Sequence, residues 1–401
     1  MTRPRARRLR PAGGLVAVSC AVTLSVSAPP VQAAAPEGRV LGAGAPGSVG
    51  GSYLVTLEGG VRASSAAGKA VAERYGADIG HIYGTVLNGY AVRAGERQAR
   101  RLAADPRVAS VVQDTRVLLD RTPRKAPSRE LDRIDRRGLP PDRRHARPEP
   151  GGRGVTVYVV DTGVRTTHRD FGGRASHGWD FVDRDGTAQD GNGHGTHVAA
   201  TAVGTSYGVA KRARVVGVRV LDDNGAGSTA RVVAGIDWVT KHAKKPAVAN
   251  LSLGGPRNDR LDAAVRASIA SGVTYTVAAG NGGLPAALYS PAGVTRAITV
   301  GATDRRDARA GFSNHGPALD LFAPGTSVTS ASHTGDTGRA TSSGTSMAAP
   351  HAAGAAALHL ARHPRATPDQ VEKALVTRAV TGKVSGRGPG SPDRLLRVPG
   401  T

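Results

Sequence analysis

The chain has 401 residues and carries 54 Lys plus Arg against 31 Asp plus Glu, a net charge of +23 at pH 7. A hydrophobic content of 39% excludes a largely disordered protein, and a single cysteine, Cys20, excludes a disulfide framework or a cysteine-based metal site. Aromatic residues, at 3%, are too few for the stacking platforms of a single-strand nucleic-acid binder. Composition therefore predicts a folded protein of several parts whose basic charge needs another explanation.

The N-terminus has the pattern of a secretory signal peptide. Five arginines precede an apolar run over 15–26, which is roughly half the length of a membrane-spanning helix. Small residues around Ala34 then offer a cleavage site. We expect residues 1–34 to be removed on export, by the general secretory or the twin-arginine route. The mature protein would be secreted and extracellular, with no transmembrane anchor and no cysteine.

A small α+β domain is predicted over 52–120, after a flexible Gly- and Pro-rich spacer over 35–51. Hydrophobic periodicity predicts strands over 53–57, 79–85, 89–93 and 108–112 and helices over 66–74 and 96–104. This β-α-β-β-α-β order is the ferredoxin-like arrangement. None of its polar residues forms a cluster typical of catalysis, so chemistry is expected elsewhere.

The rest of the chain predicts a doubly wound α/β fold. Residues 121–152 are dense in Arg, Pro and Asp and indicate a linker or processing region. Over 153–401, continuous apolar strand-like runs alternate with helix-like segments, which is typical of a mostly parallel sheet covered on both faces in three layers. The strand-like runs are 155–160, 214–220, 248–253, 273–278 and 297–300, and the clearest helices are 229–242 and 261–271.

Three segments of this second domain place a reactive side chain beside glycine. They contain Asp161, at the carboxyl end of a predicted strand, His194 in Gly-His-Gly-Thr-His, and Ser346 in Gly-Thr-Ser-Met-Ala-Ala-Pro-His. A serine hydroxyl becomes a nucleophile when an imidazole takes its proton and a carboxylate orients that imidazole. Each residue alone fits a cap or a packed side chain. Together, in the order Asp, His, Ser, they predict a catalytic triad.

These motifs resemble those of the subtilisin-like (S8) serine peptidases, and more narrowly their secreted proteinase K-like branch. The resemblance covers about residues 52–398 and implies the subtilisin-like fold. It also implies a serine endopeptidase of broad specificity that acts on proteins and peptides and is made as a self-processed zymogen. Further matching stretches lie at 207–210, 250–255, 278–281, 312–314 and 323–326.

The same resemblance implies the oxyanion and substrate sites. Asn281, with the backbone N–H of Ser346, matches the donors that hold the oxyanion, where a fixed donor lowers the barrier. The two walls of the primary specificity pocket are small and uncharged, which favours an apolar or aromatic residue before the scissile bond. Their residues are Ser252, Leu253 and Gly254 on one side and Ala278, Ala279 and Gly280 on the other.

A structural calcium ion is also implied, held by Asp320 and the backbone carbonyls of Thr295 and Ala297. The alternative for Asp320 is a solvated or N–H-capping carboxylate. The domain over 52–120 resembles the propeptide that inhibits these peptidases within the same chain, with cleavage expected between 120 and 126. We expect no organic cofactor, no specific nucleic-acid partner and a monomer.

Two other functions remain as alternatives. The high positive charge is compatible with a polyanion-binding module, although the basic residues form no reading motif. A catalytically inactive peptidase fold that acts as a binding protein is the second alternative. A serine-directed covalent inhibitor separates the enzyme from both.

Overall fold

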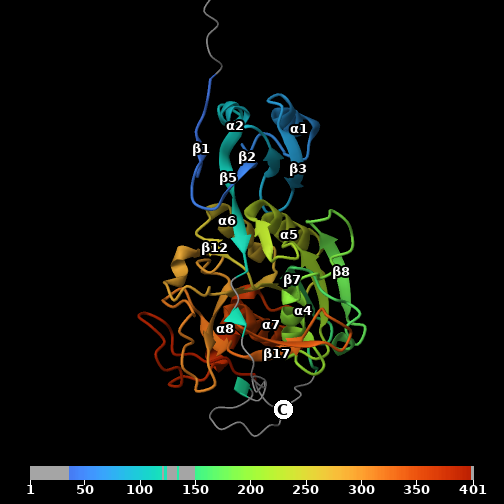
Figure 1. Cartoon of the computed structure of the whole chain (residues 1–401), viewed down its shortest axis with the longest axis vertical. Helices are drawn as coiled ribbons and strands as arrows, with labels where there is room; N and C mark the ends of the chain where they lie inside the picture. The colour runs from blue at the N-terminus through green and yellow to red at the C-terminus, as the bar shows by residue number, and fades with distance from the viewer. Residues whose placement is uncertain (1–35, 120–121, 124–132, 135–149, 399–401) are drawn as a thin grey trace, which may run out of the picture. The chain divides into compact units, whose positions relative to one another are not determined.

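A seven-stranded parallel sheet forms the centre of the described structure (Figure 1). This computed structural model describes residues 36–119, 122–123, 133–134 and 150–398, so the predicted signal peptide lies outside the described residues. In spatial order the strands are β16 (Leu321–Pro324), β15 (Ile298–Thr303), β13 (Thr274–Ala278), β11 (Ala247–Leu251), β7 (Thr156–Asp161), β9 (Arg214–Arg219) and β8 (Ala175–Asp180).

Alternation along the central strands gives the sheet two apolar faces. In β7, Val157 and Val159 join one buried cluster, whereas Tyr158 and Val160 join the other. The first cluster also contains residues of α4 (His194–Val203), α7 (Thr345–Arg362) and α8 (Pro368–Arg378), and the second those of α5 (Thr229–His242) and α6 (Asp259–Ala270). Helices therefore cover both faces, which confirms the predicted three-layer α/β fold.

A second, mixed sheet belongs to the small N-terminal domain and has the order β1-β5-β2-β4-β3. Its residues follow the predicted β-α-β-β-α-β order closely. The elements are β1 (Val40–Leu41), β2 (Ser48–Leu57), α1 (Ala66–Glu73), β3 (Asp78–Tyr83), β4 (Gly89–Arg93), α2 (Glu96–Ala103) and β5 (Val108–Leu118).

The described part of the predicted spacer over 35–51, residues 36–51, differs from the flexible segment that we expected. It contributes β1, which pairs with β5, and the first residues of β2. Gly42, Gly44 and Gly47 between these strands have positive φ, a conformation that glycine adopts without steric cost, so the chain can turn there and return to the sheet. We predicted a flexible segment from its glycine content, whereas these glycines form a turn between β1 and β2.

Strand β5 is longer than predicted and joins the two domains. The prediction ended at Val112, but the strand continues to Leu118, and its last residues pair antiparallel with β10 (Ala226–Ser228) (Figure 1). The end of β5 finds its hydrogen-bonding partner in the other domain, and a local sequence pattern does not reveal such a partner.

Shorter elements complete the described chain. These are β6 (Thr122–Pro123), β12 (Gly255–Pro256), β14 (Tyr289–Ser290), β17 (Val328–Ala331), β18 (Arg339–Ser343) and the 3₁₀ helices η1 (Arg169–Phe171) and η2 (Ala286–Leu288). The isolated pair Arg133 and Ile134 is also fixed. Arg133 makes two hydrogen bonds of 2.7 Å to Asp307, and the buried Ile134 accepts a hydrogen bond from the N–H of Val398.

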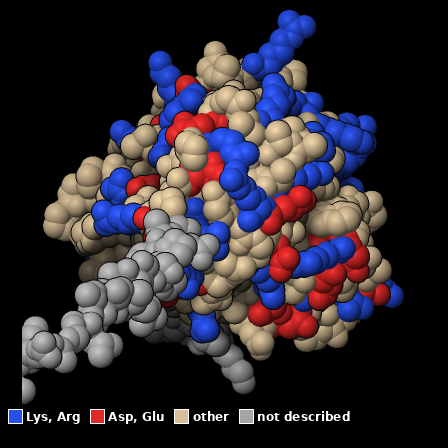
Figure 2. All heavy atoms as spheres, turned by 90° about the horizontal axis from the view of Figure 1, so that it is seen from above, with Lys and Arg blue, Asp and Glu red and all other residues tan. Residues whose placement is uncertain are grey.

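No helix in the described part of the chain is both long and apolar enough to cross a membrane. On the face seen from above the small domain, Lys and Arg side chains are scattered among Asp and Glu and form no continuous band (Figure 2). That distribution gives no support on this face to a dedicated polyanion surface.

Candidate active site

Asp161 and His194 form a buried hydrogen-bonded pair. Asp161 ends β7 and His194 begins α4, and 2.7 Å separates Asp161 Oδ1 from His194 Nδ1. The same carboxylate oxygen accepts the N–H of Thr162 at 2.8 Å. An ionised carboxylate only accepts, so Nδ1 carries a proton and, in the neutral ring, Nε2 is left as the basic nitrogen. Nε2 has no hydrogen-bond partner within the described chain, so it is available to take a proton.

Ser346 lies in the first turn of α7, where we expected the nucleophile. Its Oγ donates to the carbonyl of Ser252 at 3.0 Å, and Ser252 Oγ donates back to the carbonyl of Ser346 at 2.8 Å. The structure therefore brings the serine together with the predicted pocket wall. Its hydroxyl hydrogen bond goes to that wall and not to His194, so attack on a substrate requires the hydroxyl to turn toward His194 Nε2.

The side-chain amide of Asn281 has a defined orientation. Asn281 Oδ1 accepts the N–H of Thr345 at 2.8 Å and the Thr345 hydroxyl at 2.9 Å. A backbone N–H can only donate, so the atom facing it must be the amide oxygen and Nδ2 must be the opposite, donating end. This orientation suits the predicted oxyanion donor, beside the N-terminal turn of α7.

Backbone and side-chain contacts also fix the second pocket wall. Ala278 ends β13 and Ala279 is fully buried. Gly280, at φ 99°, donates its N–H to Thr345 Oγ1 at 3.0 Å. Asn314, to which the sequence assigned no individual role, donates to the carbonyl of Ala279 at 2.8 Å. Its Oδ1 accepts the N–H groups of Gly282 and Leu284, both at 3.0 Å.

The end of β5 lies beside Gly254 of the predicted first pocket wall. Leu118 pairs with Ala226 of β10 and also bridges to Gly254, so it lies between two backbone segments of the larger domain. The N–H of Leu119 donates to the carbonyl of Gly225 at 3.0 Å. This is strand addition, the mode in which an extended peptide is held mainly through its main chain.

Two carboxylates fix the small domain to α5, and neither was assigned a role from the sequence. Asp237 of α5 accepts the N–H groups of Gly84, Thr85 and Val86 at 3.3, 2.7 and 2.9 Å. In return, Asp114 of β5 accepts the N–H of Ala230 in the first turn of α5 at 3.0 Å. Such contacts link residues more than 100 positions apart, which local patterns cannot reveal.

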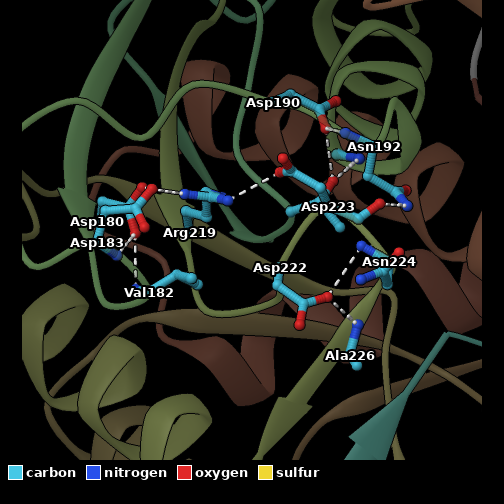
Figure 3. A network of polar contacts seen from close by, with 12 residues as sticks. Asp180, Val182, Asp183, Asp190, Asn192, Arg219, Asp222, Asp223, Asn224 and Ala226 are labelled. Atoms are coloured by element: carbon cyan, nitrogen blue, oxygen red, sulfur yellow. Dashed lines mark hydrogen bonds and ion pairs between the residues drawn. The ribbon is translucent and has the colours of Figure 1, made fainter.

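Arg219 fixes the loop that leads into β10. Its guanidinium contacts Asp180 at 2.6 Å, Asp183 and, at 2.8 Å, Asp223 (Figure 3). Burial alone lowers the pKa of Arg219, but Asp180 and Asp183 hold it above its ordinary value. Within the loop, Asp222 Oδ1 accepts the N–H groups of Asn224 and Ala226 at 2.9 and 3.0 Å. The loop before β10 is therefore held by Arg219 through Asp223 and by the hydrogen bonds that Asp222 accepts within the loop.

Asp320, Thr295 and Ala297 are the residues that the resemblance assigned to a calcium ion. Asp320 immediately precedes β16, and Thr295 and Ala297 precede the neighbouring parallel strand β15, so all three lie at the same edge of the sheet. Asp320 Oδ2 accepts the N–H of Thr299 at 2.7 Å. Burial raises the pKa of Asp320 to about 7, and the Glu372 carboxyl adds to the rise. No cluster of three or more His, Cys, Asp or Glu suited to a metal occurs among the described residues, so calcium here would depend on carbonyl oxygens.

A doubly wound sheet with a buried Asp–His pair at a strand end and a serine at a helix start defines a serine peptidase class. The sequence profile of the subtilase family matches residues 152–396, and that of peptidase inhibitor I9 matches residues 52–120. The chain belongs to the subtilase family and is a serine peptidase with an inhibitor-type propeptide domain.

Several characterised proteins are similar to it. The extracellular serine proteinase of Thermus sp. (strain Rt41A) is 51% identical over 324 residues, 81% of this chain and 78% of that protein. The alkaline serine exoprotease A of Vibrio alginolyticus is 46% identical over 327 residues, 80% of this chain but only 60% of that protein. The crystal structure of a cold adapted subtilisin-like serine proteinase matches with a TM-score of 0.65 and 50% identity, covering 67% of this chain and 97% of that one.

Proposed function

We propose that this chain is a secreted serine endopeptidase that hydrolyses peptide bonds through an acyl-enzyme. The observation that carries the proposal is the 2.7 Å hydrogen bond between Asp161 and His194. It leaves His194 Nε2 as the basic nitrogen, and the chain order Asp161, His194, Ser346 is a known order of the catalytic triad. The N-terminal signal pattern and relatives named as extracellular support secretion.

In the proposed reaction His194 removes the proton from Ser346 Oγ as the oxygen attacks the substrate carbonyl. Asp161 keeps the imidazole in the required tautomer and stabilises its charged form. Asn281 Nδ2 and the Ser346 N–H donate to the oxyanion that forms on the carbonyl oxygen. His194 then returns its proton to the leaving amine. In the second half of the reaction, His194 takes a proton from water as the water attacks the acyl group, and returns it to Ser346 Oγ as the acid is released.

Substrate binding is proposed to follow the contacts of β5. An extended peptide would pair with β10 on one side and Gly254 on the other, so main-chain hydrogen bonds give affinity with broad specificity. The small, uncharged walls at 252–254 and 278–280 favour an apolar or aromatic residue before the scissile bond.

The domain over 52–120 is proposed to act as an intramolecular inhibitor until the chain cleaves itself. In support, strand β5 pairs with β10, which we propose also binds substrate, and hydrogen bonds of Asp114 and Asp237 hold the domain to α5. Pairing that ends at Leu119 supports a cleaved bond within the few residues that follow it.

We further propose a structural calcium ion at Asp320 with the carbonyls of Thr295 and Ala297. The carboxylate chemistry fits a hard cation, and burial keeps the pKa of Asp320 raised although the Arg394 guanidinium and the Thr299 N–H both act to lower it. The ion would hold the starts of β15 and β16 together and would take no part in the reaction.

Labelling with a serine-directed organophosphorus or sulfonyl fluoride reagent tests the proposed function. We expect one adduct per chain, on the peptide that contains Ser346, with hydrolysis of a chromogenic peptide lost in proportion to labelling. An unlabelled, inactive chain would instead favour the binding-protein alternative. Retention on a heparin column does not by itself rescue the polyanion alternative, because a basic enzyme also adheres to polyanions.

A further inference from the structure

Asp190 is a buried carboxylate that the proposed mechanism does not use. Only 3% of it is exposed, and a buried carboxylate is tolerated when hydrogen bonds satisfy its oxygens. Asp190 accepts hydrogen bonds on both oxygens. Oδ1 accepts from Thr162 Oγ1 at 2.9 Å, Asn192 N at 3.0 Å and Gly193 N at 2.7 Å, and Oδ2 accepts from Thr196 N at 2.8 Å and Thr196 Oγ1 at 2.6 Å.

These bonds fix the first turn of α4, the helix that His194 begins. The first N–H groups of a helix have no partner within it, and the residue before His194 is a glycine with no capping side chain. Side chains from outside the helix supply the acceptors instead. Asn192 Oδ1 accepts the N–H of His194 at 3.2 Å, Thr162 Oγ1 that of Gly195 at 2.9 Å, and Asp190 Oδ2 that of Thr196.

The same carboxylate is connected to the residue that follows Asp161. Thr162 donates its hydroxyl to Asp190 and accepts the N–H of Gly195, so a second link joins the end of β7 to the start of α4. The first link is the 2.7 Å hydrogen bond of the catalytic pair. Productive geometry in such a site must hold within about 0.5 Å. A second link between the same two segments restricts that distance without contacting the substrate.

The network also extends away from the pair. Asn192 Nδ2 donates to the carbonyl of Asp223 at 2.8 Å, in the loop that Arg219 holds before β10 (Figure 3). Asp190 itself makes no contact with β10 or with the wall at Gly254 among its hydrogen bonds. Losing Asp190 should therefore disturb the reacting groups more than the strand that binds substrate.

We propose that Asp190 is a positioning residue that holds His194 against Asp161 by capping α4 and binding Thr162. The proposal rests on the proposed peptidase function. It assigns Asp190 no proton transfer, so it predicts a change in kcat with little change in KM. It also predicts a changed Asp161–His194 hydrogen bond when Asp190 is replaced, which can be seen without any turnover.

The test compares Asp190→Asn and Thr162→Val in the full-length chain with a matched control, Asp170→Asn. Asp170 is also buried and accepts a backbone N–H, that of Ser206 at 2.7 Å, but makes no contact with the pair. We expect Asp190→Asn to lower kcat about 10- to 100-fold and Thr162→Val about 3- to 10-fold, with KM within about twofold of the unmodified chain. Asp170→Asn should leave kcat within about twofold.

A second readout is the low-field proton resonance of the Asp161–His194 hydrogen bond, recorded in a Ser346→Ala background. It should shift or broaden with Asp190→Asn and stay in place with Asp170→Asn. An unchanged resonance, or kcat losses no larger than those of the control, would overturn the proposal. If Asp190→Asn does not fold, Thr162→Val decides by the same criteria. An unmodified chain without peptidase activity would contradict the proposed function, while the resonance would still decide the positioning claim.

Discussion

Individual residues of the site divide into those that motifs reveal and those that only the fold brings in. Asp161, His194 and Ser346 each stand in a short glycine-containing motif, because a reactive side chain at a strand end or helix start needs close backbone approach. Asp190 lies four residues before His194 in the same glycine-containing stretch, and Asn314 lies in the matching stretch 312–314, but neither has a residue type that by itself indicates its role. Their roles depend on which backbone groups lie opposite them after folding, so the sequence does not reveal what either side chain contacts.

Asn281→Ala is expected to lower kcat about 10²- to 10³-fold with KM little changed. The oxyanion would then lack the hydrogen bond from the Asn281 amide nitrogen, which faces away from Thr345. The expected magnitude is the one established for the equivalent loss in subtilisin itself. Steady-state kinetics on a chromogenic peptide measure it. The exposed Asn224 offers a control, since Asn224→Ala should retain nearly full kcat. A large rise in KM at constant kcat would show that Asn281 binds substrate rather than the transition state.

Asp320 predicts a specific pH dependence of stability in calcium-free protein. Its folded pKa of about 7 lies above the ordinary value of 3.8, so the folded state holds the proton more tightly. The stabilisation of the folded state by this proton is complete below about pH 4 and is lost as pH rises through about 7. The test measures the Tm of Ser346→Ala with and without Asp320→Asn, in a chelator, at pH 4.5 and at pH 7.5. Between these two pH values, the Tm should fall by about 3–6 °C more in the protein that keeps Asp320 than in the Asp320→Asn variant. Parallel shifts of both variants would contradict the assignment.

At the level of elements, the strands and helices with strong periodicity were predicted within a few residues. Helix α5 agrees at both ends and β4 agrees as well, because each is bounded by local signals. Strand β5 was predicted too short and the turn after β1 was missed. Both errors concern pairing between distant segments, β5 with β10 and β1 with β5, and no local pattern encodes such pairing.

The contact between α5 and the turn over 84–86 predicts how tightly the small domain inhibits. Asp237→Ala removes an acceptor of three N–H groups, which should weaken inhibition about 10- to 100-fold. The lag between chain cleavage and the appearance of full activity should shorten accordingly. As a comparison, replacing the exposed Asp259 at the start of α6 by Ala should leave the lag unchanged. An unaltered lag in Asp237→Ala would mean that β5 alone determines inhibition.

On the scale of the whole molecule, the absence of a disulfide framework leaves stability to packing and, in our proposal, to a structural calcium ion. The only cysteine of the sequence is Cys20, within the predicted signal peptide. The mature domain has continuous apolar clusters on both faces of the sheet, which supply most of the driving force for folding.

This distribution predicts that a chelator lowers the Tm, whereas a reductant does not. Reducing agent should leave the Tm of the Ser346→Ala protein unchanged, whereas a chelator should lower it by several degrees and added calcium should restore it. Differential scanning calorimetry measures both. A chelator-insensitive Tm would refute the calcium proposal and leave the peptidase assignment untouched.

The central claim is that Ser346, activated by His194, cleaves this chain and then other proteins. The most direct measurement follows the mass of the unmodified precursor and of Ser346→Ala side by side, together with hydrolysis of a chromogenic peptide that has an apolar residue before the scissile bond. We expect only the unmodified chain to lose its first ~120 residues and to turn over the peptide. Equal processing of the two chains, with no hydrolysis by either, would contradict the claim and assign the cleavage to a foreign protease.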